Sequence, residues 1–295
     1  MSRCGFIAVL GAPNAGKSTL INRLTGSKVT IVSPKPQTTR NRILGILVKD
    51  DAQFIFVDTP GIFAPRRRLD RAMVAAAWSG AGDADVIVLL IDASRKDLSM
   101  SLPIIEELKK RGQTAIIVLN KVDVAPKPHL LALAADIEAT GIAEEIFMIS
   151  AVTGDGTADL LAALRERLPA GPFHYPEDQL TDMPERLLSA EIVREHLFRN
   201  LHQEVPYELA VEPETWENFQ NGSVKIQVRI VVARDSQRGI VLGAQGKTIK
   251  RIREAAQREL HGLLGRPVHL FLHVQSDPQW QDRQAYYRLW NLDWS

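Results

Sequence analysis

The sequence predicts two domains of different class, an α/β domain in the first part of the chain and a smaller α+β domain after it. In residues 1–168, short continuous apolar runs alternate with amphipathic stretches, which is typical of a mostly parallel sheet with helices on both faces. Residues 169–185 carry four prolines and little periodicity, which indicates a semi-rigid linker. In residues 186–295 the expected strands alternate between polar and apolar residues, as half-exposed antiparallel strands do.

The composition is that of a globular protein with real cores. Of 295 residues, 45% are hydrophobic and 24% are charged, and the formal net charge is +1. The longest aliphatic run, 86–91, is too short to span a bilayer. The single cysteine, Cys4, excludes an internal disulfide framework and Cys-x-x-Cys metal clusters, which favours a reducing, cytosolic setting.

Strands and helices are expected to alternate through the first domain. The expected strands are short β-branched runs at 5–11, 43–48, 53–59, 86–92, 114–120 and 145–150. The expected helices are 17–25, 102–112, 129–141 and 157–168. Parallel strands joined by helices imply right-handed crossovers.

The segment "GAPNAGKST" lies between the first expected strand and the first expected helix. It satisfies the pattern of a phosphate-binding loop, in which glycines let backbone N–H groups turn toward phosphate oxygens at a helix N-terminus. We expect Lys17 to bridge the β- and γ-phosphates and the Ser18 hydroxyl to ligate Mg²⁺. The expected loop residues are Gly11, Ala12, Pro13, Asn14, Ala15, Gly16, Lys17, Ser18 and Thr19.

A second motif, "DTPG", ends the expected strand at 53–59. It consists of Asp58, Thr59, Pro60 and Gly61. We expect Asp58 to lie near Mg²⁺, usually through a water, and the Gly61 N–H to lie near the γ-phosphate. A simple strand-ending turn would explain these residue types, but not their position after a phosphate-binding loop.

Two later motifs select the base. In "NKVD", the Asp123 carboxylate can accept hydrogen bonds from N1–H and the 2-amino group of guanine, whereas adenine would leave it unpaired. Asn120 can orient the loop and meet the base edge, and the Lys121 stem can cover the ring. In "SAV", which is Ser150, Ala151 and Val152, we expect the Ala151 N–H to meet guanine O6. Four motifs in this order, each at a strand end, indicate a guanine nucleotide.

The segment "SPKPQTTR" at 33–40 is expected to respond to the γ-phosphate. A threonine hydroxyl there can reach Mg²⁺ only while the γ-phosphate is present, so the segment would be ordered by GTP and released after hydrolysis. Thr38 and Thr39 both qualify, and we favour Thr39. The alternative is a surface loop with incidental threonines.

With these motifs the chain resembles the Era group of translation-factor-related GTPases. Many signalling GTPases carry a glutamine after the Asp-x-x-Gly motif to orient the attacking water, and here Ile62 occupies that position. Intrinsic hydrolysis should therefore be slow. In related families that lack the glutamine, an asparagine of the phosphate-binding loop helps to hold a K⁺ ion that neutralises charge. Asn14 occupies that position; alternatively, it only caps the turn.

The second domain carries the segment "GAQG" before a basic helix expected at 247–264. Between residues 225 and 266, ten basic residues stand against three acidic ones. The loop resembles that of a KH domain, in which backbone N–H groups approach a single-stranded nucleic acid, with the apolar run before it as a strand end. The helix–strand–strand–helix–strand order fits the prokaryotic arrangement. The candidate RNA-binding residues are Gly243, Ala244, Gln245, Gly246, Lys247, Lys250, Arg251 and Arg253. The alternative is an ordinary turn before a solvated helix.

The resemblance implies a cytoplasmic, monomeric switch that uses GTP, GDP and Mg²⁺, with K⁺ as a further candidate. It further implies binding to the 3′ end of 16S ribosomal RNA and to the small ribosomal subunit, in the biogenesis of that subunit. Three alternatives stay open: an RNA-binding scaffold whose nucleotide site is slow or structural, a GTPase acting on another RNA, and a GTPase at a membrane surface. The helix at 247–258 is basic but lacks bulky aromatic residues, so only a weak peripheral contact with the inner face of the membrane is expected.

Overall fold

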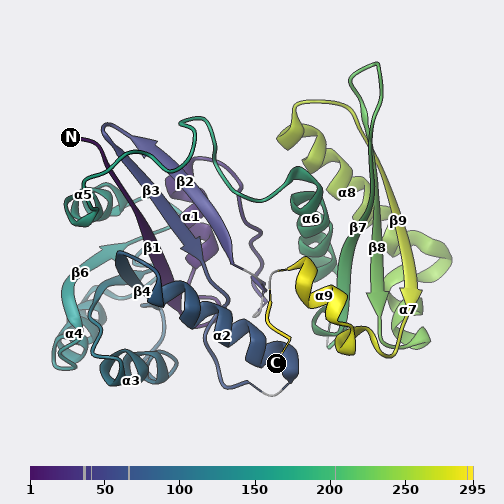
Figure 1. Cartoon of the computed structure of the whole chain (residues 1–295). Coiled ribbons are helices and arrows are strands. Elements are labelled where there is room, and N and C mark those ends of the chain that lie inside the picture. Colours follow the sequence, from purple (N-terminus) through teal and green to yellow (C-terminus); the bar gives the residue numbers. More distant parts are fainter. Residues whose placement is uncertain (36–37, 41, 66, 203, 291, 295) are drawn as a thin grey trace. The chain divides into compact units, whose positions relative to one another are not determined.

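The computed structural model describes residues 1–35, 38–40, 42–65, 67–202, 204–290 and 292–294. Within these residues the chain forms two compact units. The first unit is drawn from Met1–Thr30, Thr39–Asp182 and Trp290–Ser295, and the second from Ile31–Thr38 and Met183–Leu289. Each unit is a sheet covered by helices (Figure 1).

The first unit contains a six-stranded sheet in the order β2-β3-β1-β4-β5-β6. β1 pairs in parallel with both β3 and β4, and β5 pairs in parallel with β4 and β6. β2 is antiparallel to β3, because the short turn between them forms a hairpin. The strands are β1 (Arg3–Gly11), β2 (Ile43–Lys49), β3 (Ala52–Asp58), β4 (Val86–Asp92), β5 (Ala115–Asn120) and β6 (Ala143–Ile149).

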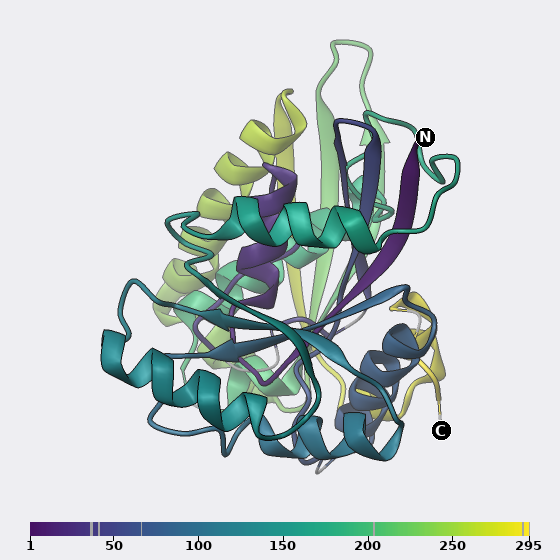
Figure 2. The ribbon, with the colours of Figure 1, turned by 90° about the vertical axis from the view of Figure 1, so that its left-hand side faces the viewer.

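Helices cover both faces of this sheet, as the apolar runs predict (Figures 1 and 2). α1 (Lys17–Thr25) and α5 (Thr157–Arg167) pack on one face. α2 (Arg68–Gly82), α3 (Leu102–Lys110) and α4 (Lys127–Glu138) pack on the other. Side chains of the central strands β1, β4 and β5 alternate between the two cores, so both faces of these strands are dry and continuous apolar runs are required.

One helix, α2, was not expected from the sequence. Its buried positions are mostly small, with alanine at 72, 77 and 81, and small residues give a weak apolar stripe. Alanine nevertheless has the highest helix propensity, and packing against β1 and β4 supplies the remaining stabilisation.

The second unit has a three-stranded sheet in the order β7-β8-β9. β7 and β8 are antiparallel, and β8 and β9 are parallel. Its elements are α6 (Glu185–Asn200), a 3₁₀ turn (Val205–Glu208), β7 (Leu209–Asn218), β8 (Val224–Val232), α7 (Asp235–Leu242), a 3₁₀ turn (Ala244–Gly246), α8 (Lys247–Leu264), β9 (Val268–Ser276), a 3₁₀ turn (Trp280–Asp282) and α9 (Gln284–Leu289).

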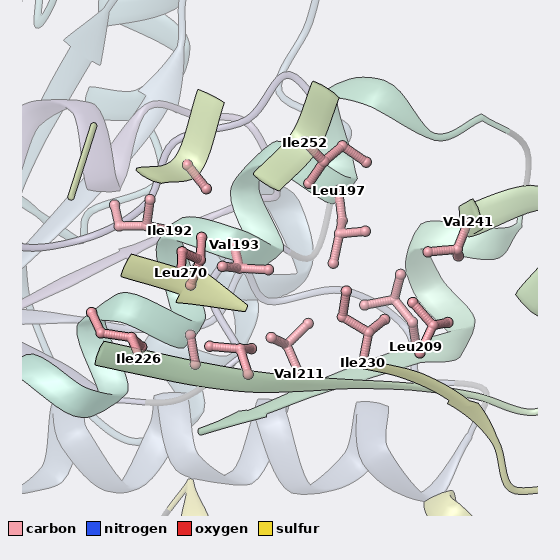
Figure 3. Packing of buried hydrophobic residues seen from close by; sticks show 14 of the residues in the cluster. Ile192, Val193, Leu197, Leu209, Val211, Ile226, Ile230, Val241, Ile252 and Leu270 are labelled. Atoms are coloured by element: carbon pink, nitrogen blue, oxygen red, sulfur yellow. The ribbon is translucent and has the colours of Figure 1, made fainter. Parts of the chain in front are cut away.

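The core of the second unit lies between this sheet and α6 and α8 (Figure 3). Along β8, residues Val224, Ile226, Val228 and Ile230 are all fully buried and alternate with partly exposed residues. Ile192 and Leu197 of α6 and Ile252 of α8 complete this core. The helices therefore cover one face of the sheet, and the alternation seen in the sequence marks which face that is.

The apolar run before the "GAQG" loop is a helix and not the expected strand end. Residues 240–242 form the last turn of α7, so the element order is helix–strand–strand–helix–helix–strand. The run is too short for its periodicity to distinguish the two forms. Val241 is fully buried and Ile240 is 50% exposed, which is the burial of a helix that turns one side to the core.

Most of the stretch expected to link the domains, 169–185, packs on the first unit, which extends to Asp182. The Gln53 side chain accepts hydrogen bonds from the backbone N–H groups of His174 and Tyr175 and donates to the Tyr175 carbonyl. The Ile46 N–H donates to the Leu180 carbonyl at 2.8 Å. This stretch therefore supplies partners to the outer edge of β2, which would otherwise be an unpaired sheet edge. Within the described ranges, no helix is both long and apolar enough to cross a membrane.

Candidate nucleotide site and RNA-binding loop

The phosphate-binding loop joins β1 to α1, as the sequence predicts. Gly16 has φ +101°, and a Cβ there would lie 2.3 Å from Nδ2 of Asn120, so only glycine fits. The Lys17 ammonium is buried and donates to the carbonyls of Gly11 (3.0 Å) and Ala12 (3.1 Å). Burial lowers the pKa of Lys17 to about 8, although Asp58 opposes this shift. A polyphosphate would give this cation the partner that best offsets its burial.

Hydroxyl groups from three segments converge on Asp58 at the end of β3. Its Oδ2 accepts from the hydroxyls of Ser18 (2.8 Å), Thr30 (2.8 Å) and Thr39 (3.3 Å). Its Oδ1 is buried and has no hydrogen-bond partner among the described residues. Burial raises the pKa of Asp58, while Lys17 and the three hydroxyls oppose the shift. A carboxylate oxygen left without a partner beside a serine and a threonine hydroxyl is a donor set that fits Mg²⁺ or a water bound to it.

The structure separates the two candidate threonines. The Thr39 hydroxyl lies 3.0 Å from the Ser18 hydroxyl, whereas the Thr38 hydroxyl donates to the Lys35 carbonyl at 2.7 Å. Thr39 is therefore the threonine that reaches the Asp58 cluster. Two residues of the same motif, Pro36 and Gln37, lie outside the described residues. The contact of Thr30 with Asp58 was not predicted from the sequence. Its only sign there is a hydroxyl residue three positions before the segment 33–40.

Asn120, at the end of β5, ties two loops together. Its Nδ2 donates to the Ala15 carbonyl at 2.8 Å, and its Oδ1 accepts from the Ala151 N–H at 2.9 Å. The side chain is almost completely buried. We expected the Ala151 N–H to meet guanine O6, but here this N–H is given to Asn120. The side chain therefore connects the two loops, and the contact of the Ala151 N–H with guanine stays a prediction.

Lys121 and Asp123 follow Asn120 with different surroundings. Lys121 has φ +71°, and its ammonium forms an ion pair of 2.6 Å with Asp92 at the end of β4. Burial alone would raise the pKa of Asp92, but hydrogen bonds from Lys121 and Ser94 hold it below its ordinary value. The Asp123 side chain is exposed. Asp92 was missed from the sequence, where it stands only as the acidic end of the run "VIVLLID".

Ile62 is buried in the core on one face of the sheet, and its aliphatic side chain cannot hydrogen-bond a water. It is 7% exposed and packs with residues of β1, β4 and α2, while its N–H donates to the Gly11 carbonyl at 3.2 Å.

Asn14 has an exposed side chain and φ +65°. Asparagine tolerates this left-handed conformation better than most residues, so the turn alone accounts for the residue type. Two hydrogen bonds close the loop after β6. The Thr153 N–H donates to the Ser150 hydroxyl, and the Thr153 hydroxyl donates to the Asp155 carboxylate.

The "GAQG" loop forms a tight turn between α7 and α8. Gly243 has φ +71°, and a Cβ there would lie 2.1 Å from the Thr248 hydroxyl. Gln245 has φ +51°, and Ala244 and Gln245 are exposed. Only glycine therefore fits at position 243, and the exposure of Ala244 and Gln245 leaves this part of the loop accessible to a ligand.

The first two turns of α8 carry the cations expected from the sequence. Lys247, Lys250 and Arg251 are exposed. Arg253 is partly buried, donates to Gln257 at 3.2 Å and lies 3.6 Å from Glu254. Three of the four cations therefore face solvent next to the helix N-terminus, which is a favourable arrangement for phosphates.

Comparison with known families supports both halves of this description. A family model described as a 50S ribosome-binding GTPase matches residues 6–121, and a KH domain model matches residues 204–281. The GTPase Era of Erythrobacter litoralis (strain HTCC2594) is 53% identical over 298 residues, covering 100% of this chain and 98% of that protein. The GTPase Era of Sinorhizobium medicae (strain WSM419) is 53% identical over 99% of this chain and 94% of that protein.

The chain belongs to the Era family of GTPases. A solved structure of Era in complex with MgGDPNP and nucleotides 1506–1542 of 16S ribosomal RNA is similar, with a TM-score of 0.93 and 38% identity, covering 98% of this chain and 99% of that one. The structure of Aquifex aeolicus Era bound to GDP and AlF₄⁻ has a TM-score of 0.91 and 38% identity, covering 98% of both chains.

Membership of the Era family confirms the resemblance and the fold class predicted from the sequence. The first unit is a P-loop GTPase domain with a mostly parallel sheet, and the second contains a KH domain. The roles of individual residues, the domain limits at 168 and 186 and the potassium ion stay predictions. Among the nucleotide motifs, the fold brings Ser18 and Thr39 together at Asp58. It also brings the backbone of Ala15 and of Ala151 to the Asn120 side chain.

Proposed function

We propose that the chain is a GTP-hydrolysing switch that binds the 3′ end of 16S ribosomal RNA and acts in the biogenesis of the small ribosomal subunit. This proposal rests on the presence of a candidate nucleotide site and a candidate RNA-binding loop in the same chain. The Asp58 cluster with the phosphate-binding loop fits a magnesium nucleotide, and the "GAQG" loop with α8 fits a phosphate backbone. A relative of known structure that matches nearly the whole chain was solved in complex with MgGDPNP and a segment of 16S ribosomal RNA.

Hydrolysis on this scaffold is in-line attack of a water on the γ-phosphate, with no covalent intermediate. Mg²⁺, held by Ser18, Thr39 and (through water) Asp58, would neutralise charge on the phosphate oxygens. Lys17 bridges the β- and γ-phosphates, and the Gly61 N–H donates to the γ-phosphate. Because Ile62 has no polar group and is buried, this chain orients the water without a side chain at that position, and slow intrinsic turnover follows.

Recognition of guanine is assigned to the loops after β5 and β6. Asp123 accepts from N1–H and the 2-amino group, and its exposed carboxylate is free of the desolvation that a buried acid would carry. Asn120 fixes the loops, and Lys121, held by Asp92, covers the ring. The remaining predicted contacts come from Gly11–Thr19, Asp58–Gly61 and Ser150–Val152.

We further propose that Asn14 contributes to a K⁺ site beside the β- and γ-phosphates. Its support is chemical: the position of Asn14 in the loop, an exposed side-chain amide and the need for a second positive charge where no water-orienting glutamine exists. The left-handed turn at Asn14 would by itself explain why asparagine stands at this position. Comparing GTP turnover in K⁺ and in Na⁺ decides between the two explanations.

RNA binding is assigned to residues 243–247 together with Lys250, Arg251 and Arg253. Backbone N–H groups of the loop and the cations of α8 would contact phosphates and set affinity, while exposed apolar residues such as Ile240 (50% exposed) would contact bases. We assign the GTPase domain to 1–168, the linker to 169–185 and the KH domain to 186–295, in a cytoplasmic monomer. A weak peripheral contact of α8 with anionic lipid is the most that its basic surface supports.

Crosslinking tests the proposal directly. The full chain is loaded with GDP or a non-hydrolysable GTP analogue, crosslinked to total RNA and the bound fragments are sequenced, while GTP turnover is measured in parallel. Enrichment of the 3′ end of 16S RNA with the analogue, and measurable turnover, are expected. Equal recovery of random RNA in both states would overturn the proposal. RNA enrichment without single-turnover hydrolysis would instead favour a scaffold with a structural nucleotide site.

A further inference from the structure

Asn22 lies four residues after Ser18 on α1, so the two side chains project from the same side of that helix. The Asn22 amide bonds to the backbone of the residues that follow the helix. Its Oδ1 accepts from the N–H groups of Val29 (3.0 Å) and Thr30 (3.1 Å), and its Nδ2 donates to the Thr30 carbonyl at 2.8 Å. One side chain therefore gives these two residues the backbone partners that a neighbouring strand would give.

Thr30 is held at both its backbone and its side chain by residues of the first unit. Its hydroxyl donates to Oδ2 of Asp58 at 2.8 Å. Val29, the residue before it, is buried in the core between α1 and the sheet. The Thr30 hydroxyl is therefore fixed relative to α1, the helix that begins at the phosphate-binding loop.

The two oxygens of Asp58 have different surroundings. Oδ2 accepts from three hydroxyls, whereas Oδ1 is buried and has no hydrogen-bond partner among the described residues. Two of these hydroxyls, from Ser18 and Thr39, are the ones assigned to Mg²⁺. The Thr30 hydroxyl has no such assignment, so its contribution is the hydrogen bond itself. A carboxylate held firmly at one oxygen keeps a fixed orientation, and Oδ1 is the oxygen that remains for a water of the metal.

We propose that Asn22 and Thr30 are positioning residues for the magnesium site. Asn22 holds Thr30, and the Thr30 hydroxyl holds the Asp58 carboxylate so that Oδ1 stays available to the water shell of Mg²⁺. This inference rests on the proposed function. None of these hydrogen bonds includes a residue that is expected to respond to the γ-phosphate, so the support is the same with GDP and with GTP.

The test uses full-length variants that change one hydrogen-bonding group at a time. Thr30→Val removes the hydroxyl and keeps the shape of the side chain, whereas Thr30→Ser keeps the hydroxyl. Asn22→Ala removes the contacts with the backbone of residues 29 and 30. The control is Thr140→Val, in the turn between α4 and β6 of the same unit, which removes a hydroxyl that donates to the Ile137 carbonyl.

Equilibrium binding of fluorescent GDP and of a fluorescent non-hydrolysable GTP analogue is measured in excess EDTA and across a Mg²⁺ titration. The ratio of the affinity in saturating Mg²⁺ to the affinity in EDTA measures how strongly the metal and the nucleotide support each other. We expect this ratio to fall about 5-fold or more in Thr30→Val and in Asn22→Ala, for both nucleotides, because a charge-assisted hydrogen bond no longer holds Asp58. Thr30→Ser and the control should match the wild type.

A second measurement follows the hold of Asn22 on the backbone. Hydrogen exchange of the Val29 and Thr30 amides should become faster in Asn22→Ala and stay at the wild-type rate in the control. Unchanged exchange of these amides would overturn the role of Asn22.

A purely structural role would lower the affinities in EDTA and in Mg²⁺ together and leave their ratio unchanged. The proposal is overturned by an unchanged ratio in Thr30→Val, or by a fall that is confined to the GTP analogue. Thr30→Val and Asn22→Ala are read independently, so either decides if the other does not fold. Failure of the proposed function would show in the wild type itself, as nucleotide binding that does not depend on Mg²⁺ or as absent GTP turnover.

Discussion

The side-chain amide of Asn120 donates to the Ala15 carbonyl at 2.8 Å and so fixes the phosphate-binding loop to the end of β5. The same side chain accepts from the Ala151 N–H. One buried residue thus connects the phosphate-binding loop, through Ala15, to the loop after β6, through Ala151. Several consequences of this arrangement and of the sites around it can be measured.

Replacing Asn120 with alanine should weaken the first unit and its binding of GDP and GTP alike. The change leaves the Ala15 carbonyl and the Ala151 N–H buried without the Asn120 side chain as a partner, at about 1–3 kcal/mol each, so about 2–6 kcal/mol of local stability is lost. Hydrogen exchange of the β1 and β5 amides, read by mass spectrometry, measures this loss. Asn221→Ala, in the exposed turn between β7 and β8, is the matched control. Unchanged protection of β1 and β5 would contradict the positioning role.

Asp123→Asn should change the base that is bound. In xanthine a carbonyl replaces the 2-amino group of guanine, and the asparagine amide can donate to this carbonyl. With guanine, the variant loses the two contacts that the carboxylate makes with N1–H and the 2-amino group. We expect GDP affinity to fall by about 100-fold and xanthosine diphosphate affinity to rise. Competition binding measures both. The exposed residue Asp136 of α4, replaced by asparagine, serves as the control. A parallel loss for both bases would show that Asp123 does not read the base.

Asp92→Asn should weaken guanine nucleotide binding through Lys121, since it replaces the ion pair of 2.6 Å with a neutral contact. The pKa of Asp92 is held below its ordinary value of 3.8, so the wild-type pair is present above that value and is lost only as pH falls through the lower folded pKa. The affinity difference between variant and wild type should therefore be the same at pH 6 and pH 8. Fluorescent GDP titrations at both values test this, and a difference that disappears at pH 6 would refute it.

Turnover of GTP should depend on the monovalent cation. If Asn14 helps to hold K⁺, hydrolysis in K⁺ exceeds that in Na⁺ by about 10-fold or more, because a preorganised charge stabilises the transition state. Asn14→Ala should remove the difference without changing GDP affinity much, and Asn14→Gly, which keeps the left-handed turn, separates the side chain from the backbone. Equal rates of the wild type in the two salts would exclude the cation role.

Two aspartates in the loop should weaken RNA binding strongly and leave the fold intact. Ala244 and Gln245 are both exposed, so Ala244→Asp with Gln245→Asp places negative charge against the phosphate backbone. Affinity for a single-stranded RNA from the 3′ end of 16S RNA should fall about 10-fold or more, with a steeper loss at low salt. Gln220→Asp with Gln279→Asp adds the same charge at exposed positions on other elements and should bind RNA nearly normally. Normal binding by the loop variant would place the RNA elsewhere.

Much of this protein could be predicted from the sequence because its signals are local. Continuous apolar runs follow from strands buried on both faces, and the glycines of the phosphate-binding loop follow from backbone conformations that other residues avoid. Asp58, Asn120 and Asp123 stand at strand ends, and the carboxyl ends of neighbouring parallel strands meet at one edge of the sheet. Helix α2 escaped prediction because its buried face is built mainly from alanine, and α7 because an apolar run of three residues carries no period.

The fold class, the guanine nucleotide chemistry and the presence of a KH domain could be predicted from residue types at fixed spacing. Other features became visible only in the structure: Thr39 and not Thr38 contacts Asp58, Thr30 bonds to the same carboxylate, Asp92 pairs with Lys121, and the Ala151 N–H donates to Asn120. It alone assigned residues 31–38 to the second unit. Those outcomes depend on which atoms remote in sequence come within hydrogen-bonding distance, and that is set by the packing of whole elements.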